Sequence, residues 1–219
     1  MSDLKNTVKE TVAKLIASLN QRNRDIIARR FGLKTGSKET LESIGQGYGI
    51  TRERVRQIEE VSLAQIRKEL AAGSSVKVKP LVALAENVLE QAGGVLNERE
   101  LFNRFFGAAA ANVESSEAAD TSLIFILTLD GKLKRLPEDD NFYSFWSLSI
   151  QHAQAFRDSV AGFVKALTKN GSPIAESALT DFSKKFGVSS KYASPSSLTL
   201  LASISKEIGK NIFNQVGSA

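Results

Sequence analysis

Residues 51–59 read TRERVRQIE, and this stretch decides the fold of the N-terminal third of the 219-residue chain. Thr51 is suited to cap a helix, and the helical pattern after it runs to about Leu70. A spacing of 100° per residue, with Arg52 at zero, puts one stripe of small and apolar side chains at roughly 240° to 320°. That stripe consists of Val55, Ile58, Ser62 and Ile66. The opposite face of the first two turns is polar and consists of Arg52, Glu53, Arg56 and Gln57.

The four polar side chains are of types that read base edges in DNA. Arg can bond O6 and N7 of guanine together, Gln can pair with adenine, and Glu can accept a hydrogen bond from cytosine. They occupy the N-terminal end of the helix, which is the end that enters the major groove in helix-turn-helix proteins. A solvated helix face laced with i,i+4 ion pairs would show the same residue types, so the pattern alone leaves both interpretations open.

Three further helices are predicted before this one. A first helix carries apolar residues at helical spacing, namely Leu4, Val8, Val12, Leu15, Ile16 and Leu19. A second, about Gln21–Phe31, ends at Gly32, a residue suited to a left-handed C-cap. A third opens at Thr40, and we expect a tight turn at Gly45–Gly49. Together with the helix after Thr51, they predict a helix-turn-helix.

The stretch 19–70 closely resembles region four of the primary sigma-factor family of bacterial RNA polymerase. The matching motifs are RFGL at 30–33, TLESIG at 40–45 and TRERVRQIE at 51–59. The resemblance covers roughly a quarter of the chain. Two departures stand out: the turn at 46–49 is rich in glycine, and the sequence shows no counterpart of the family regions that bind the polymerase clamp and melt the promoter.

The resemblance implies a module that binds the upstream (−35-type) promoter element. It implies base readers at Arg52, Glu53, Arg56 and Gln57. It implies phosphate contacts at Arg22, Arg30 and Arg54, with Thr51 also near the DNA backbone. It further implies that the module docks on the flap of the polymerase β subunit through a largely apolar surface on its other side.

Charge divides the chain in the same way as its motifs. Residues 1–79 carry a net charge of +7, residues 80–150 carry −6, and residues 151–219 carry +4. We therefore predict a DNA-binding domain at 1–72, a linker at 73–79, an acidic domain at 80–150 and a further domain at 151–219. A basic domain suits a polyanion, whereas the acidic domain is a poor phosphate binder and suits a protein partner.

The two later domains both follow a winged-helix order, so the expected fold class is mainly α with short β-hairpins. In the acidic domain we expect helices at 80–90 and 97–106, a helix or buried strand at 121–129, and a hairpin of 132–136 with 141–148. The last domain repeats the plan with helices at 156–168, 177–186 and 196–204 and a strand at 208–216. Both weakly resemble the HARE-HTH winged-helix family. The lysines of the last domain, Lys184, Lys185 and Lys191, could touch DNA or be ordinary surface charge.

Composition argues against an enzyme. The chain lacks Cys and has one histidine. It therefore has almost no residues for a thiol nucleophile, a Ser-His-Asp triad or a His-based metal site. We expect no catalytic residue, metal or cofactor. His152 is read as a surface residue, the acidic run 138–140 as a solvated hairpin tip, and Phe142, Phe145 and Trp146 as core packing. Segments 107–119 and 187–197 read as loops.

The leading hypothesis is a sequence-specific transcription regulator that binds double-stranded, promoter-like DNA. No apolar stretch approaches the ~20 residues of a membrane span, so we expect a protein of the bacterial cytoplasm, associated with the nucleoid. One alternative is a sigma-like adaptor that binds the polymerase β flap and recruits or blocks another factor. Another is the DNA-binding subunit of a restriction or repair system.

Overall fold

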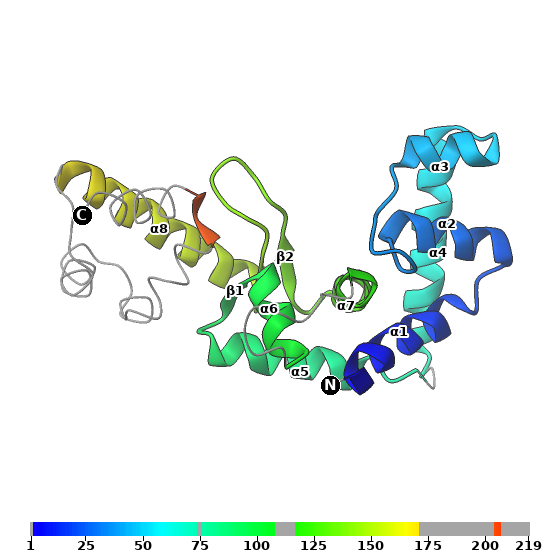
Figure 1. The fold of residues 1–219 in the computed structure, drawn as a ribbon, viewed down its shortest axis with the longest axis horizontal. Helices are drawn as coiled ribbons and strands as arrows, with labels where there is room; N and C mark the ends of the chain where they lie inside the picture. Colours follow the sequence, from blue (N-terminus) through cyan, green and yellow to red (C-terminus); the bar gives the residue numbers. More distant parts are fainter. Residues whose placement is uncertain (1, 74–75, 108–116, 171–203, 207–219) are drawn as a thin grey trace. The chain divides into compact units, whose positions relative to one another are not determined.

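The computed structural model describes residues 2–73, 76–107, 117–170 and 204–206. Helices predominate among them, and the sheet in this part of the chain has three short strands. The predicted mainly-α fold class is therefore confirmed. The chain divides into two compact units, which are residues 1–85 with 102–132 and residues 86–101 with 133–219 (Figure 1).

Four helices of the first unit coincide with those predicted around the TRERVRQIE stretch. They are α1 (Ser2–Ile16), α2 (Gln21–Phe31), α3 (Leu41–Tyr48) and α4 (Arg52–Ala71). The side-chain oxygens of Asn20, Thr40 and Thr51 each accept the backbone N–H three residues later and so cap α2, α3 and α4. Gly32 ends α2 in the left-handed conformation, with φ at 68°. The predicted caps at Thr51 and Gly32 are confirmed, and α3 begins after Thr40 as predicted.

The tight turn predicted at Gly45–Gly49 is wrong. Helix α3 continues through Tyr48, and the chain reverses at Gly49, where φ is 63°. Gly45 is buried inside the helix, and a Cβ atom there would lie 2.7 Å from the carbonyl oxygen of Ile50. Glycine is needed at this position because the reversal at Gly49 brings the backbone of Ile50 close to it.

The core of the helix-turn-helix joins α2, α3 and α4. Ile26, Ile44 and Val55 are completely buried against one another. Four partly buried side chains surround them, namely Leu41, Tyr48, Ile50 and Ile58. Ser62 and Ile66 continue the buried side of α4, so the apolar stripe faces inward as its spacing predicted.

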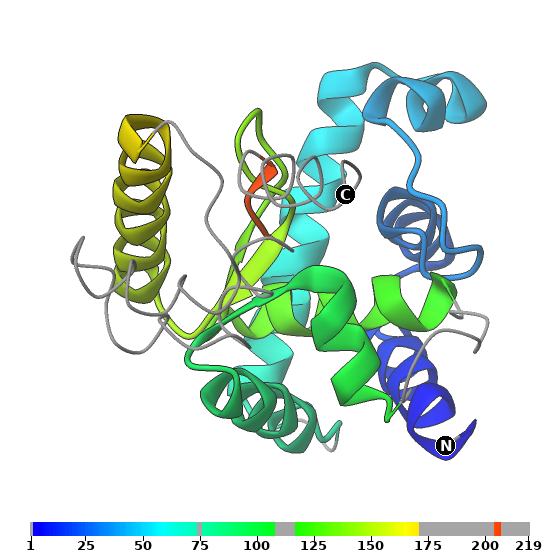
Figure 2. The same ribbon diagram turned by 60° about the vertical axis from the view of Figure 1, so that its left-hand side comes forward.

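Helix α7 (Glu117–Asp130) packs against α1, α2 and α4, although it lies in the segment predicted to form the acidic domain. Figures 1 and 2 both show it alongside α1. The hydroxyl of Thr121 donates to the carbonyl oxygen of Gly32 at 2.9 Å, and the ring of Phe125 meets that of Phe31 edge-on. Arg67 donates to the carbonyl oxygen of Leu129 at 3.4 Å. Helix α7 is thus an added helix of the bundle that holds α4.

The boundary between the two units falls within α5 (Lys79–Gln91) and α6 (Glu98–Phe105). The packing units therefore differ from the domains at 1–72, 80–150 and 151–219, which stay a prediction. At 121–129 the sequence left helix and strand open, and the structure has a helix. The predicted loop at 107–119 is wrong for residues 117–119, which belong to α7.

The second unit is built on a sheet with the strand order β1-β3-β2. Its strands are β1 (Val95–Asn97), β2 (Lys134–Leu136) and β3 (Phe145–Ser147), and both pairings are antiparallel. The predicted hairpin is confirmed as β2 and β3, whereas β1 was not predicted. Helix α8 (Ile150–Asn170) packs against β3 and β1.

The three aromatic residues predicted to form core packing, Phe142, Phe145 and Trp146, do so. Phe145 and Trp146 are completely buried, and the rings of Phe142, Phe145 and Phe156 lie within 5.6 to 6.4 Å of one another. The indole N–H of Trp146 donates to Glu98 at 2.9 Å. These contacts account for the aromatics without a base-stacking role.

Two minor predictions for the second unit need correction. Asp139 does more than solvate a hairpin tip, because its carboxylate accepts the backbone N–H groups of Asn141 and Phe142 and pairs with Arg157 of α8 at 2.7 Å. His152 is half-buried, and its Nδ1 lies 2.9 Å from the hydroxyl of Ser149. Both residues therefore help to shape the unit.

Most of the last predicted domain lies outside the described residues. Helix α8 confirms the helix expected at 156–168 and extends it at both ends. The elements predicted at 177–186, 187–197 and 208–216, most of 196–204, and the three lysines Lys184, Lys185 and Lys191 lie beyond the described part.

Candidate nucleic-acid interface

Helix α4 presents the predicted polar face to solvent. Arg52, Glu53, Arg56 and Gln57 are all exposed, whereas Val55 on the opposite face is completely buried. The Thr51 cap starts the helix immediately before this face, and the core of α2 and α3 fixes its rotation. The structure therefore brings the four predicted base readers together on one accessible surface.

These polar side chains bind one another in the absence of DNA. The guanidinium of Arg56 makes a two-pronged contact with Glu53, at 2.6 and 2.8 Å. Gln57 donates weakly to the same carboxylate at 3.5 Å and accepts from Arg54 at 3.1 Å. The hydrogen bond from Arg56 is the main reason that the pKa of Glu53 lies below its usual value. The ion pairs that the pattern allowed are thus present, on the same side chains that could read bases.

An open groove runs between the start of α2 and the exposed face of α4. Its volume is about 610 Å³, and the guanidinium-bearing side chains of Arg22 and Arg54 line it together with Gln57. The guanidinium of Arg22 also lies 5.3 Å from the centre of the Tyr48 ring. Two of the predicted phosphate-contact residues therefore flank the predicted base readers, and each is exposed.

Arg30, the third arginine predicted to contact phosphate, is partly engaged inside the module. It is half-buried, and its Nε donates to Glu59 of α4 at 3.1 Å. Its Nη1 donates to the backbone carbonyl oxygen of Glu39, also at 3.1 Å. Arg30 therefore joins α2, the α2–α3 connection and α4. The motif contained this residue but gave no sign of its structural contacts.

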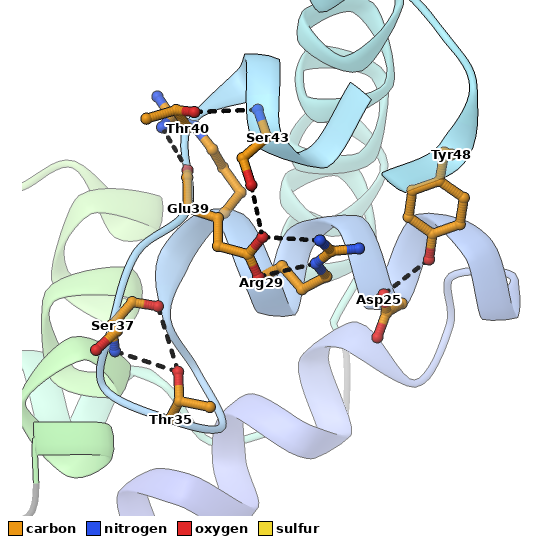
Figure 3. Close-up of polar contacts among 9 residues, drawn as sticks. Asp25, Arg29, Thr35, Ser37, Glu39, Thr40, Ser43 and Tyr48 are labelled. Carbon is orange, nitrogen blue, oxygen red and sulfur yellow. Dashed lines mark hydrogen bonds and ion pairs between the residues drawn. The ribbon is translucent and has the colours of Figure 1, made fainter. Parts of the chain in front are cut away.

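A polar network that the sequence did not reveal holds α2 against α3 (Figure 3). Arg29 makes a two-pronged contact with Glu39 at 2.7 and 2.8 Å, and the hydroxyl of Ser43 donates to the same carboxylate. The Tyr48 hydroxyl donates to Asp25 at 2.7 Å. The partners are 10 and 23 residues apart, so no local spacing pattern could have indicated them.

This network has electrostatic consequences for its members. The hydrogen bond from Arg29 is the main cause that lowers the pKa of Glu39. The hydrogen bond to Asp25 raises the pKa of the Tyr48 phenol. Charge-assisted bonds of this kind are stronger than neutral ones. They brace the angle between α2 and α3.

The described residues give no sign of a metal site or of a membrane span. Within them, no three acidic or histidine side chains lie close enough to hold a metal ion together. None of the helices in the same ranges has the length and apolar content needed to cross a membrane.

The fold and the exposed face of α4 define a helix-turn-helix DNA-binding module. Residues 15–68 match the family model described as Sigma-70, region 4. Over 63 residues the chain is 46% identical to the RNA polymerase sigma factor SigA of Nostoc sp. and 43% identical to SigA1 of Synechococcus elongatus, in each case 29% of this chain and 16% of the relative. It is 42% identical over 60 residues to the sigma factor RpoS of Coxiella burnetii, 27% of this chain and 17% of that protein.

These matches confirm the resemblance predicted for residues 19–70. The chain spans about a sixth of the length of these curated relatives. The likeness is thus to one module of a sigma factor, and the activities of the whole relatives do not transfer with it.

Proposed function

We propose that this chain is a sequence-specific transcription regulator that reads a promoter-like, −35-type element in double-stranded DNA through α4. The exposed polar face of α4, set in a module that matches sigma-70 region 4, carries the proposal. Arg52, Glu53, Arg56 and Gln57 contact base edges in the major groove, and Arg22, Arg30, Thr51 and Arg54 contact phosphates. The protein acts by binding alone, on the nucleoid in the bacterial cytoplasm.

The electrostatics of the module suit this role. The first 79 residues carry a net charge of +7, which attracts DNA and makes binding sensitive to salt. Arg22 and Arg54 flank the base-reading face across the groove, where phosphates of a bound duplex would meet them. Arginine forms two parallel hydrogen bonds to guanine or to phosphate, so one residue type serves both kinds of contact.

Selection of bound sequences from a random duplex pool tests the proposal. We expect an enriched motif that resembles a −35 element. Arg52→Ala should weaken binding to that motif by about 1–3 kcal/mol and relax the base preference at one position. Arg54→Ala should weaken binding to all sequences alike. It should also reduce the slope of log affinity against log salt concentration by about 1. Lys14→Ala, which removes an exposed charge from α1, is the control. If Arg52→Ala leaves affinity and preference unchanged, α4 does not read the groove.

A second candidate function is an adaptor that docks on the flap of the RNA polymerase β subunit. The names of the matched relatives, which are RNA polymerase sigma factors, favour it. In this chain α7 already packs on one side of the bundle, so any partner that uses that side must displace α7. A pull-down with the isolated flap, run beside a promoter-DNA shift assay, separates the two functions. Flap binding without DNA binding favours the adaptor.

A further inference from the structure

A fifth polar side chain lies on the face of α4 that carries the proposed base readers. On the same angular scale, with Arg52 at zero, Glu60 falls at about 80°, between Arg56 and Glu53. Its side chain is 62% exposed. Glu60 thus extends the polar face by one helical turn, and neither the motif nor the family match gives it a role.

Glu60 completes the set of partners of Arg56. The Nε and Nη2 atoms of Arg56 bind Glu53, and its Nη1 binds Glu60. All three guanidinium nitrogens are therefore engaged with carboxylates when no DNA is present. A two-pronged contact with guanine needs two of these nitrogens. Three of the five N–H donors of Arg56 are thus occupied, so the two carboxylates compete with a guanine edge for its guanidinium.

The charges of residues 52–60 bear on this competition between DNA and the carboxylates for Arg56. Residues 52–60 hold three Arg and three Glu, so the segment is neutral overall. Glu59 is engaged with Arg30, away from the exposed face, and Glu53 is itself a proposed base reader. Glu60 is therefore the carboxylate that opposes the approach of phosphates without any proposed contact of its own to a base.

We propose that Glu60 is a positioning residue for DNA specificity, which competes with DNA for the guanidinium of Arg56. This inference rests on the proposed function. On a non-target duplex Arg56 meets no suitably placed guanine and stays with Glu60, so it adds nothing to phosphate binding. On a target site the guanine edge replaces the carboxylate. Because only the target site breaks this ion pair, Glu60 lowers specific affinity more than non-specific affinity.

The test is Glu60→Gln, which keeps the shape of the side chain and removes its charge. Because residue 60 is exposed, the variant should fold like the wild type, and its far-UV circular dichroism checks this. Affinity for the selected site should rise roughly two- to fivefold, which is the range that an exposed ion pair can supply. Affinity for a non-target duplex should rise less, because Arg56 breaks no ion pair there, so the specificity ratio rises.

Two controls assign the effect to Arg56. Glu10→Gln removes an exposed carboxylate from α1 and should leave the specificity ratio unchanged. In an Arg56→Ala background, Glu60→Gln should no longer alter that ratio. An unchanged ratio in Glu60→Gln, or an altered ratio that persists without Arg56, would overturn the inference. The wild-type chain reports on the proposed function separately, because a wild type that prefers no sequence would refute that function itself.

Discussion

Replacing Phe125 with Ala should destabilise the unit that contains the recognition helix. Phe125 lies in α7 and is 1% exposed, and its ring meets Phe31 of α2 edge-on with the centroids 5.0 Å apart. Truncation of a buried Phe to Ala typically costs about 3–5 kcal/mol, of which the aromatic pair supplies roughly 0.5–1.5. Since whole domains are stable by only about 5–15 kcal/mol, the loss is a large fraction of the total.

Urea unfolding followed by far-UV circular dichroism measures this loss. With a slope of about 1–3 kcal/mol per molar urea, the midpoint of the affected transition should fall by roughly 2 M. Leu84→Ala is the matched control, because Leu84 lies in α5 of the same unit but is 39% exposed. Its effect should stay within about 0.5 kcal/mol. A cost below about 1 kcal/mol for Phe125→Ala would show that α7 does not pack on the bundle.

Two further predictions concern the connections of the helix-turn-helix. Arg29 holds the pKa of Glu39 below its usual value. The contact therefore stabilises the protein at any pH above the ordinary glutamate pKa of about 4. This stabilisation is lost as the pH falls through the lowered pKa of Glu39. Glu39→Gln should therefore have a lower free energy of unfolding than the wild type at neutral pH, and its free energy of unfolding should fall less on acidification. Urea unfolding curves of both proteins at neutral and at acidic pH measure this, and an equal or larger fall for Glu39→Gln would contradict the reasoning. Thr51→Ala removes the cap of α4 and should cost about 1 kcal/mol, seen as a lower melting temperature. Thr51→Ser should restore most of the lost stability. A serine variant with a melting temperature as low as that of the alanine variant would show that capping is not the cause.

Features of the module that depend on neighbours in sequence could be predicted. The caps at Thr40 and Thr51 and the stop at Gly32 follow from residues within one turn of each helix end. The buried stripe of α4 follows from the 3.6-residue period, because Val55 and Ile66 recur on one face. The exposed polar face then follows as the remainder of the same helix.

Contacts between distant residues could not be predicted in this way. The pair Arg29–Glu39 and the bridge from Arg30 to Glu59 depend on how α2, α3 and α4 pack, and charged residues at such positions look like ordinary surface charge in a sequence. Gly45 misled for a different, local reason. Glycine signals a turn, but Gly45 lies inside α3, where it makes room for the backbone of Ile50 as the chain reverses at Gly49. Strand β1 has three residues, too few for any period to show.

The position of α7 is the most informative of these unpredicted features. Its segment is apolar on all sides, with nine buried residues, which indicates burial but does not say against what. In helix-turn-helix proteins the helix that enters the groove presents polar side chains to the bases. Helix α7 exposes only Glu117, Thr128 and Asp130 and carries no Lys or Arg.

Because α7 packs against α1, α2 and α4 and offers only acidic or neutral side chains, it cannot serve as a second DNA-reading helix. The net charge of −6 over residues 80–150 points the same way, since a duplex would repel that segment. Both observations assign α7 to the support of the helix-turn-helix. Helix α7 therefore acts on the module indirectly, through the stability of the bundle that presents α4.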